Sequence, residues 1–111
     1  MKSILFVEDE DVFYPLFSML ASRFSFNSIV SKNIKDAKKE LSNNKIELVV
    51  IDYELPDGKG DELNRYIKEN YPDILTALSS GHGDILKSRF DYDYVVDKSD
   101  IVNFIKKISQ E

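Results

Sequence analysis

The feature that most constrains the fold is an apolar run without a polar residue in it, Leu48-Val49-Val50-Ile51. A strand with one face in water alternates apolar and polar residues, so a run without alternation indicates a strand buried on both faces of a parallel sheet. Asp52 follows this run directly. A carboxylate has little structural purpose there, but the position lies where open α/β sheets place their chemistry, beyond the carboxyl ends of the strands. Asp52 is therefore the first candidate functional residue.

Short apolar runs recur along the chain, and helical patterns separate them. The runs predict strands over residues 4–7, 28–30, 48–51, 74–78 and 94–96. Apolar residues spaced by three and four predict helices over 13–24, with Pro15 in the first turn, over 34–43 after Asn33 as N-cap, over 61–71, and from 99–100 onward. The region from Asp84 to Phe90 predicts only one or two further turns.

This alternation of strands and helices predicts parallel βαβ units. We expect an α/β fold with a doubly wound five-stranded parallel sheet, helices on both faces and the flavodoxin-like strand order 2-1-3-4-5. Residues 1–111 are expected to form a single domain, without a separate output domain.

Composition excludes several functional classes. The chain has no cysteine and one histidine, which excludes disulfides, thiolate zinc sites and multi-histidine metal sites. Its net charge of −5, with no basic stripe, argues against binding to nucleic acid or to an anionic membrane. We find no pattern of a signal peptide or membrane span, so a cytoplasmic location is the expectation.

Polar residues follow the predicted strands at one edge of the sheet. Glu8 and Asp9 follow the first strand and Asp52 the third, and strand order places these two strands side by side. Three carboxylates in a small cleft need protons or a cation, and oxygen ligands favour Mg²⁺ or Mn²⁺. Calcium is less suited, since the spacing lacks the alternating acids of a calcium loop.

A hydroxyl and an ammonium group are expected at the same edge. Ser79 and Ser80 follow the fourth strand, and Lys98 follows the fifth. A metal ion, a hydroxyl donor and a lysine beside an aspartate suit a phosphoryl group, with the aspartate as nucleophile.

The whole chain resembles the receiver domain of two-component response regulators. The resemblance is carried by segments at the ends of the predicted strands: residues 4–10 (ILFVEDE), 49–60 (VVIDYELPDGKG), 78–84 (LSSGHGD) and 95–98 (VVDK). It implies that a histidine kinase or phosphotransfer protein phosphorylates Asp52, and that the domain signals through a downstream protein target. Beyond self-catalysed phosphoryl transfer and autodephosphorylation, no enzyme activity is implied.

The resemblance also implies a role for each site residue. Asp9, the carboxylate of Asp52 and the backbone carbonyl of Glu54 would bind Mg²⁺, with Glu8 acting through water. Ser80 would be the switch hydroxyl, although Ser79 remains an alternative, and Lys98 would be the family's invariant lysine. Glu54 and His82 hold the positions that tune dephosphorylation.

The chain departs from the family near its fourth helix and fifth strand. Ser80 and Lys98 are closer in sequence than usual by roughly one helical turn, which predicts a short or irregular fourth helix. Val95 holds the position of the switch aromatic, and Tyr94, one residue early, is the candidate for that role. Asp97 adds a carboxylate next to Lys98 that could compete for its charge.

Other functions remain open. The altered switch region motivates a phosphorylation-independent pseudo-receiver that acts as a docking or dimerisation module. A metal-dependent phosphohydrolase of the haloacid dehalogenase type is a further alternative, with Glu54 at the second acid position. The expected assembly is a monomer or weak dimer, without direct contacts to nucleic acid or membrane.

Ordinary structural roles are also open for single residues. Asp52 could begin the turn at Leu55-Pro56-Asp57-Gly58, and Lys98 could be a solvated surface lysine. Tyr94 could be a strand residue and His82 a loop residue.

Overall fold

The computed structural model describes residues 2–88 and 91–110. A five-stranded parallel sheet forms the centre, with the order β2-β1-β3-β6-β7. Its strands are β1 (Ser3–Val7), β2 (Asn27–Ser31), β3 (Leu48–Ile51), β6 (Leu75–Ser80) and β7 (Tyr94–Asp97). A two-stranded antiparallel hairpin, β4 (Glu54–Leu55) with β5 (Gly58–Lys59), follows β3. The predicted strand order is confirmed, since β6 and β7 are the fourth and fifth strands of the main sheet.

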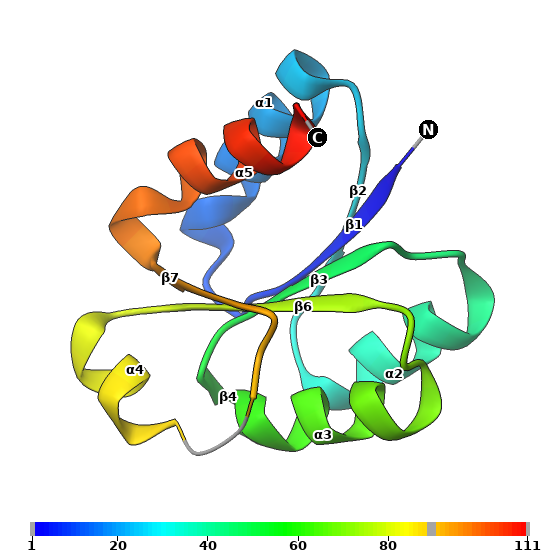
Figure 1. The fold of residues 1–111 in the computed structure, drawn as a ribbon, viewed down its shortest axis with the longest axis vertical. Helices are drawn as coiled ribbons and strands as arrows, with labels where there is room; N and C mark the ends of the chain where they lie inside the picture. Colours follow the sequence, from blue (N-terminus) through cyan, green and yellow to red (C-terminus); the bar gives the residue numbers. More distant parts are fainter. Residues whose placement is uncertain (1, 89–90, 111) are drawn as a thin grey trace.

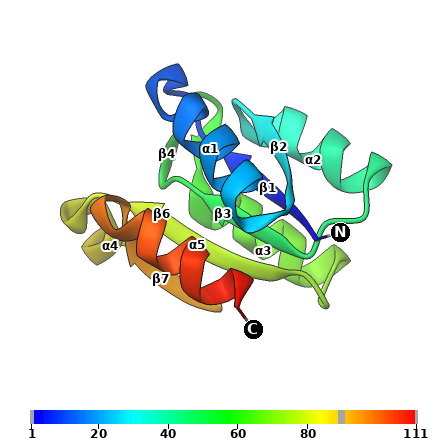
Figure 2. The same cartoon turned by 90° about the horizontal axis from the view of Figure 1, so that it is seen from above.

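Helices cover both faces of this sheet (Figures 1 and 2). One face carries α1 (Tyr14–Phe24) and α5 (Ile101–Ser109), and the other carries α2 (Ile34–Asn43) and α3 (Gly60–Asn70). The short α4 (His82–Lys87) contacts β6 and β7. Two 3-10 turns, η1 (Asp11–Phe13) and η2 (Lys98–Asp100), precede α1 and α5. None of the helices described is long and apolar enough to span a membrane.

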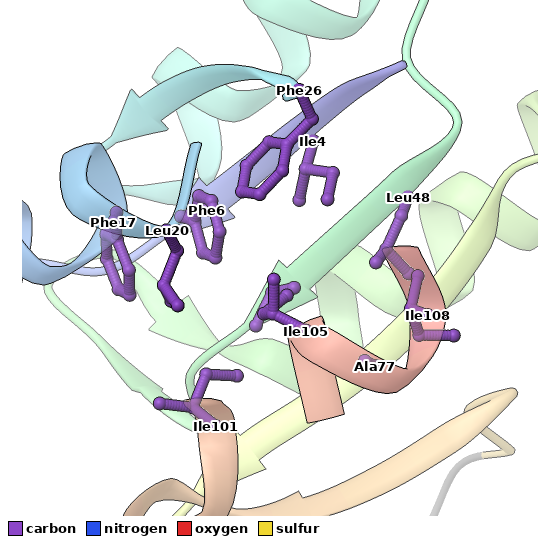
Figure 3. Packing of buried hydrophobic residues seen from close by; sticks show 11 residues of the cluster. Ile4, Phe6, Phe17, Leu20, Phe26, Leu48, Ala77, Ile101, Ile105 and Ile108 are labelled. Carbon is purple, nitrogen blue, oxygen red and sulfur yellow. The ribbon is translucent and has the colours of Figure 1, made fainter. Parts of the chain in front are cut away.

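The apolar runs are buried on both faces, as their lack of alternation predicts. In β3, Leu48 and Val50 pack beneath α1 and α5, whereas Val49 and Ile51 pack against α2 and α3. All four are less than 5% exposed. Figure 3 shows the first of these two layers, in which Phe6 and Phe17 stack with their ring centroids 4.1 Å apart. The hydrophobic effect on two opposite faces fixes this central strand in the sheet.

Local sequence signals set the helix ends. The side chain of Asn33 accepts a hydrogen bond from the backbone N–H of Asp36, which confirms the predicted N-cap of α2. Pro15 lies in the first turn of α1, where its missing N–H costs least. Tyr71, before Pro72, caps the end of α3.

The prediction for the fourth strand was wrong at its carboxyl end. The expected strand stopped at Leu78, but β6 continues through Ser80. Ser79 and Ser80 pair with Val96 and Asp97 of β7, and both serines are buried. Backbone pairing and burial prevail here over the preference of serine for turns.

The fourth helix is short, as the sequence predicts. It has six residues, and of the expected region Asp84 to Phe90 the last two positions lie outside the described residues. Two residues that follow α4 bind α3: Ser88 and Tyr92 both donate side-chain hydrogen bonds to Oδ1 of Asp61, at 2.7 and 2.8 Å. Burial, with the hydrogen bond to Asp61, raises the pKa of Tyr92. Polar contacts with α3 thus position Ser88 and Tyr92.

The hairpin after β3 is attached to the amino end of α2. The carboxylate of Asp57 accepts hydrogen bonds from the backbone N–H groups of Ile34 at 2.8 Å and Lys35 at 3.0 Å. Burial alone would raise the pKa of Asp57, but these two donors outweigh it and lower the pKa below the usual value. Asp57 therefore caps a helix that is distant in sequence and holds the hairpin in place.

Replacing Asp57 by alanine is expected to lower the free energy of unfolding by about 1 kcal/mol at neutral pH, the usual cost of a lost helix cap. Because the folded-state pKa of Asp57 is lowered, its stabilisation is present above the unfolded pKa of about 4 and is lost as the pH falls through the folded value. Urea denaturation at several pH values measures this effect. Asp73→Ala, at an exposed aspartate, is the control. A stability gap that stays constant down to pH 2 would contradict the capping role.

Candidate functional site

Asp52 lies directly after β3, with 8% of its surface exposed. Its Oδ1 accepts hydrogen bonds from the backbone N–H of Tyr53 at 2.8 Å and from Oγ of Ser80 at 2.9 Å. Its Oδ2 accepts one from Nζ of Lys98 at 3.1 Å. Each carboxylate oxygen of Asp52 therefore accepts at least one hydrogen bond. The side chains of Ser80 and Lys98 are two of the donors.

Gly60, the first residue of α3, allows this close packing around Asp52. A Cβ atom at Gly60 would lie 2.3 Å from the carbonyl oxygen of Asp52, a distance at which atoms overlap. The backbone N–H of Gly60 also donates to the carbonyl of Tyr53 at 2.7 Å. The residue must be glycine for α3 to begin this near the aspartate.

Lys98 bridges two carboxylates. Its Nζ lies 2.6 Å from Oε1 of Glu8 and 3.1 Å from Oδ2 of Asp52. Burial alone would lower the pKa of Lys98, but the bond to Glu8 and the charges of both acids outweigh it and raise the pKa. Burial and the charge of Asp52 raise the pKa of Glu8, against the opposing effect of Lys98. One ammonium thus compensates two acids at the sheet edge.

The acidic residues after β1 gather in a small group. Carboxylate oxygens of Glu8, Asp9 and Glu10 all lie within 4.8 Å of one another, an arrangement that can hold a metal ion. Oxygen donors of this kind fit a hard divalent cation such as Mg²⁺. Glu8 is buried, whereas Asp9 and Glu10 are exposed. Glu10 joins the two acids that the sequence analysis names, and the run of three consecutive acids is the signal that points to it.

The two serines at the end of β6 have different surroundings. Oγ of Ser80 lies 2.9 Å from Oδ1 of Asp52 and 3.4 Å from Oδ2 of Asp84. Ser79 has no hydrogen bond to Asp52 among those found in the described residues, although it lines a small cavity of about 10 Å³ that Asp52 and Lys98 also line. Successive residues of a strand point to opposite faces, which separates the two hydroxyls. Of the two candidates, Ser80 is the one in contact with Asp52.

Asp97 forms no ion pair with Lys98 among those found in the described residues, so it does not compete for that charge. Oδ1 of Asp97 accepts hydrogen bonds from the backbone N–H of Ser99 at 3.1 Å and from its hydroxyl at 2.8 Å. These two donors lower the pKa of Asp97. Its carboxylate caps η2, so the ammonium of Lys98 remains directed at Glu8 and Asp52.

The remaining candidate residues surround the site without contacting Asp52 through any interaction found among the described residues. Tyr94 pairs in the sheet with Ala77, which precedes Ser80 by three residues along β6. The ring of Tyr94 packs edge-on against the ring of Phe104, with the centroids 5.2 Å apart. Glu54 binds Nζ of Lys59 at 2.6 Å across the hairpin. His82 is exposed and begins α4. The structure thus brings Glu8, Asp52, Ser80 and Lys98 together and leaves these three at the periphery.

Part of the chain is similar in sequence to two bacterial regulatory proteins. No protein-family model matches the chain. It is 28% identical over 84 residues to the response regulator protein PilR of Pseudomonas aeruginosa, a match that covers 76% of this chain and 19% of PilR. It is 25% identical over 84 residues to the photosynthetic apparatus regulatory protein RegA of Rhodobacter capsulatus, covering 76% of this chain and 46% of RegA. The chain therefore spans less than half the length of both relatives.

The fold has close structural neighbours. The response regulator TrrA of Thermotoga maritima, solved in complex with Mg²⁺–BeF, superposes with a TM-score of 0.85 at 23% identity and covers 99% of this chain and 98% of that structure. A CheY-like receiver domain from Methanospirillum hungatei has a TM-score of 0.80 at 18% identity, with 99% and 94% covered. These similarities show that the fold is that of receiver domains.

Lys98→Met is expected to lower the free energy of unfolding by about 3 kcal/mol at neutral pH, because it leaves Glu8 and Asp52 as buried carboxylates without their shared cation. Lys59→Met is the matched control: Lys59 also lies 2.6 Å from a glutamate, but that pair is about half exposed. The control should leave the stability nearly unchanged. Chemical denaturation of the parent and of both variants measures the free energies of unfolding. Equal free energies for Lys98→Met and Lys59→Met would contradict the role given to Lys98.

Proposed function

We propose that this chain, a response regulator receiver domain in sequence and fold, accepts a phosphoryl group on Asp52 from a histidine kinase or a phosphotransfer protein. The observation that carries the proposal is the environment of one side chain. The carboxylate of Asp52 is nearly buried, yet Ser80 donates to one of its oxygens and Lys98 to the other. This arrangement suits a nucleophile whose product carries additional negative charge.

The proposed transfer is a single displacement. One carboxylate oxygen of Asp52 forms a bond to phosphorus, the bond between phosphorus and the donor's histidine nitrogen breaks, and the electron pair leaves with that nitrogen. Lys98 and Ser80 then bind oxygens of the phosphoryl group in place of the carboxylate oxygens they contact now. The energetic benefit comes from donors that are already oriented before the reaction.

The acidic group after β1 fits the Mg²⁺ that such a transfer needs. Asp9, the carboxylate of Asp52 and the backbone carbonyl of Glu54 would hold the ion, with Glu8 acting through water. When bound, Mg²⁺ would neutralise charge on the phosphoryl oxygens. Mn²⁺ satisfies the same donors. The charge of the ion would also offset that of Glu8, the acid that now pairs with Lys98.

Signalling would follow from the movement of Ser80 toward the phosphoryl group, while Lys98 exchanges its contact with Asp52 for one with a phosphoryl oxygen. Ser80 also lies 3.4 Å from Asp84 in α4, so its movement reaches the short helix directly. Tyr94 would respond through β7, and Glu54 and His82 would tune hydrolysis from the rim of the site. We place this activity in the cytoplasm, in a monomer or weak dimer that contacts a downstream protein target.

The direct test is incubation with acetyl phosphate and Mg²⁺, followed by mass spectrometry of the intact chain. We expect one added phosphoryl group on the unmodified sequence and none on Asp52→Asn, because an amide oxygen cannot serve as the nucleophile. Asp57→Asn is the control, since Asp57 is a carboxylate in the same loop that only caps α2. It should be phosphorylated like the parent.

Two outcomes would contradict the proposal. The parent chain would show no mass increase at saturating Mg²⁺, or Asp52→Asn would be modified to the same extent as the parent. A parent that shows no increase would favour the phosphorylation-independent docking module instead.

A further inference from the structure

The ammonium group of Lys98 has a third neighbour in addition to Glu8 and Asp52. Its Nζ lies 4.4 Å from the centroid of the Phe13 ring. A cation over the face of an aromatic ring at this distance is attracted by the quadrupole of the ring. Phe13 is the last residue of η1, the turn that connects the acidic residues after β1 to α1. Residues near the amino end of the chain, Glu8 and Phe13, thus contact the Nζ atom of Lys98 near its carboxyl end.

The Phe13 ring is held in place by the core beneath it. It stacks on Phe17 with the ring centroids 6.5 Å apart and an interplanar angle of 19°. Phe17 in turn stacks on the fully buried Phe6 at 4.1 Å. This column of rings runs from the centre of the sheet to Lys98, so the position of the Phe13 ring is set by packing.

Phe13 also forms part of the apolar wall on this side of the site. It lines the cavity of about 10 Å³ together with Asp52, Lys98 and apolar residues of β1, β3, α1 and α5. That volume is near the minimum that holds one water molecule. The ammonium of Lys98 thus contacts two carboxylates and one aromatic face. An ammonium on a flexible four-carbon chain needs such contacts to keep one position.

We propose that Phe13 is a positioning residue for the phosphoryl transfer: its ring fixes the ammonium of Lys98 where that group must meet the phosphoryl oxygens. This inference rests on the proposed function of Asp52. The contact that the ring makes is with the ammonium of Lys98, so its effect on the reaction passes through Lys98. An aromatic residue is required at this position, because an aliphatic side chain of similar size fills the space but offers the cation no π face.

The test compares Phe13→Leu, Phe13→Tyr and Phe24→Leu. Phe24 is the control, since it is likewise half-buried against the same core and has a cation, Arg23, over its ring at 5.7 Å, but it lies at the far end of α1. Phosphorylation by acetyl phosphate with Mg²⁺ is followed over time by mass spectrometry. We expect Phe13→Leu to slow the reaction about threefold to tenfold, as the loss of one cation–π contact implies. Phe13→Tyr and Phe24→Leu should retain the parent's rate.

A second readout does not depend on phosphorylation. In the NMR spectrum of the parent chain, the ε-methylene protons of Lys98 should be shifted upfield by the ring current of Phe13. The shift should disappear in Phe13→Leu and persist in Phe13→Tyr. A Lys98 resonance without this shift in the parent, or a Phe13→Leu rate equal to that of the parent, would overturn the inference. If the parent itself is not phosphorylated, the proposed function of Asp52 fails, and the NMR result alone decides whether Phe13 holds Lys98.

Discussion

The bridge from Lys98 to Glu8 and Asp52 is the interaction on which the site depends. The sheet brings the carboxyl ends of β1 and β3 side by side, and each end carries a buried acid. Two carboxylates so close repel each other, and the folded chain tolerates them because one ammonium from the end of β7 reaches both. The capping of η2 by Asp97 and the aromatic face of Phe13 keep that ammonium in place.

The sequence was sufficient to predict the parts of the structure that depend on local patterns. Runs such as Leu48-Val49-Val50-Ile51 define buried strands because their lack of alternation has one simple physical interpretation. The acids and the lysine of the site follow strand ends, so the strand order alone places Glu8, Asp52 and Lys98 at the same edge. The short α4 was also predictable, because fewer residues separate Ser80 and Lys98 than in the receiver domains that the chain resembles.

Features that depend on the three-dimensional placement of single side chains were not predictable. Ser79 and Ser80 differ only in the face to which they point, and that depends on where β6 ends. The contact of Phe13 with Lys98 depends on the path of η1, and the cap that Asp57 provides for α2 joins segments 22 residues or more apart. Asp97 is next to Lys98 in sequence, yet its carboxylate accepts two hydrogen bonds from Ser99. It therefore caps η2.

The most direct test of the account is a crystal structure of the chain with Mg²⁺ and beryllofluoride. The account predicts beryllium on a carboxylate oxygen of Asp52, fluorides in contact with Oγ of Ser80 and Nζ of Lys98, and Mg²⁺ beside Asp9. Lys98 should have exchanged its present contact with Asp52 for the fluorides. An Asp52 without beryllium at saturating concentrations, with Lys98 still bridging Glu8 and Asp52, would contradict the central claim that this aspartate is a phosphoryl acceptor.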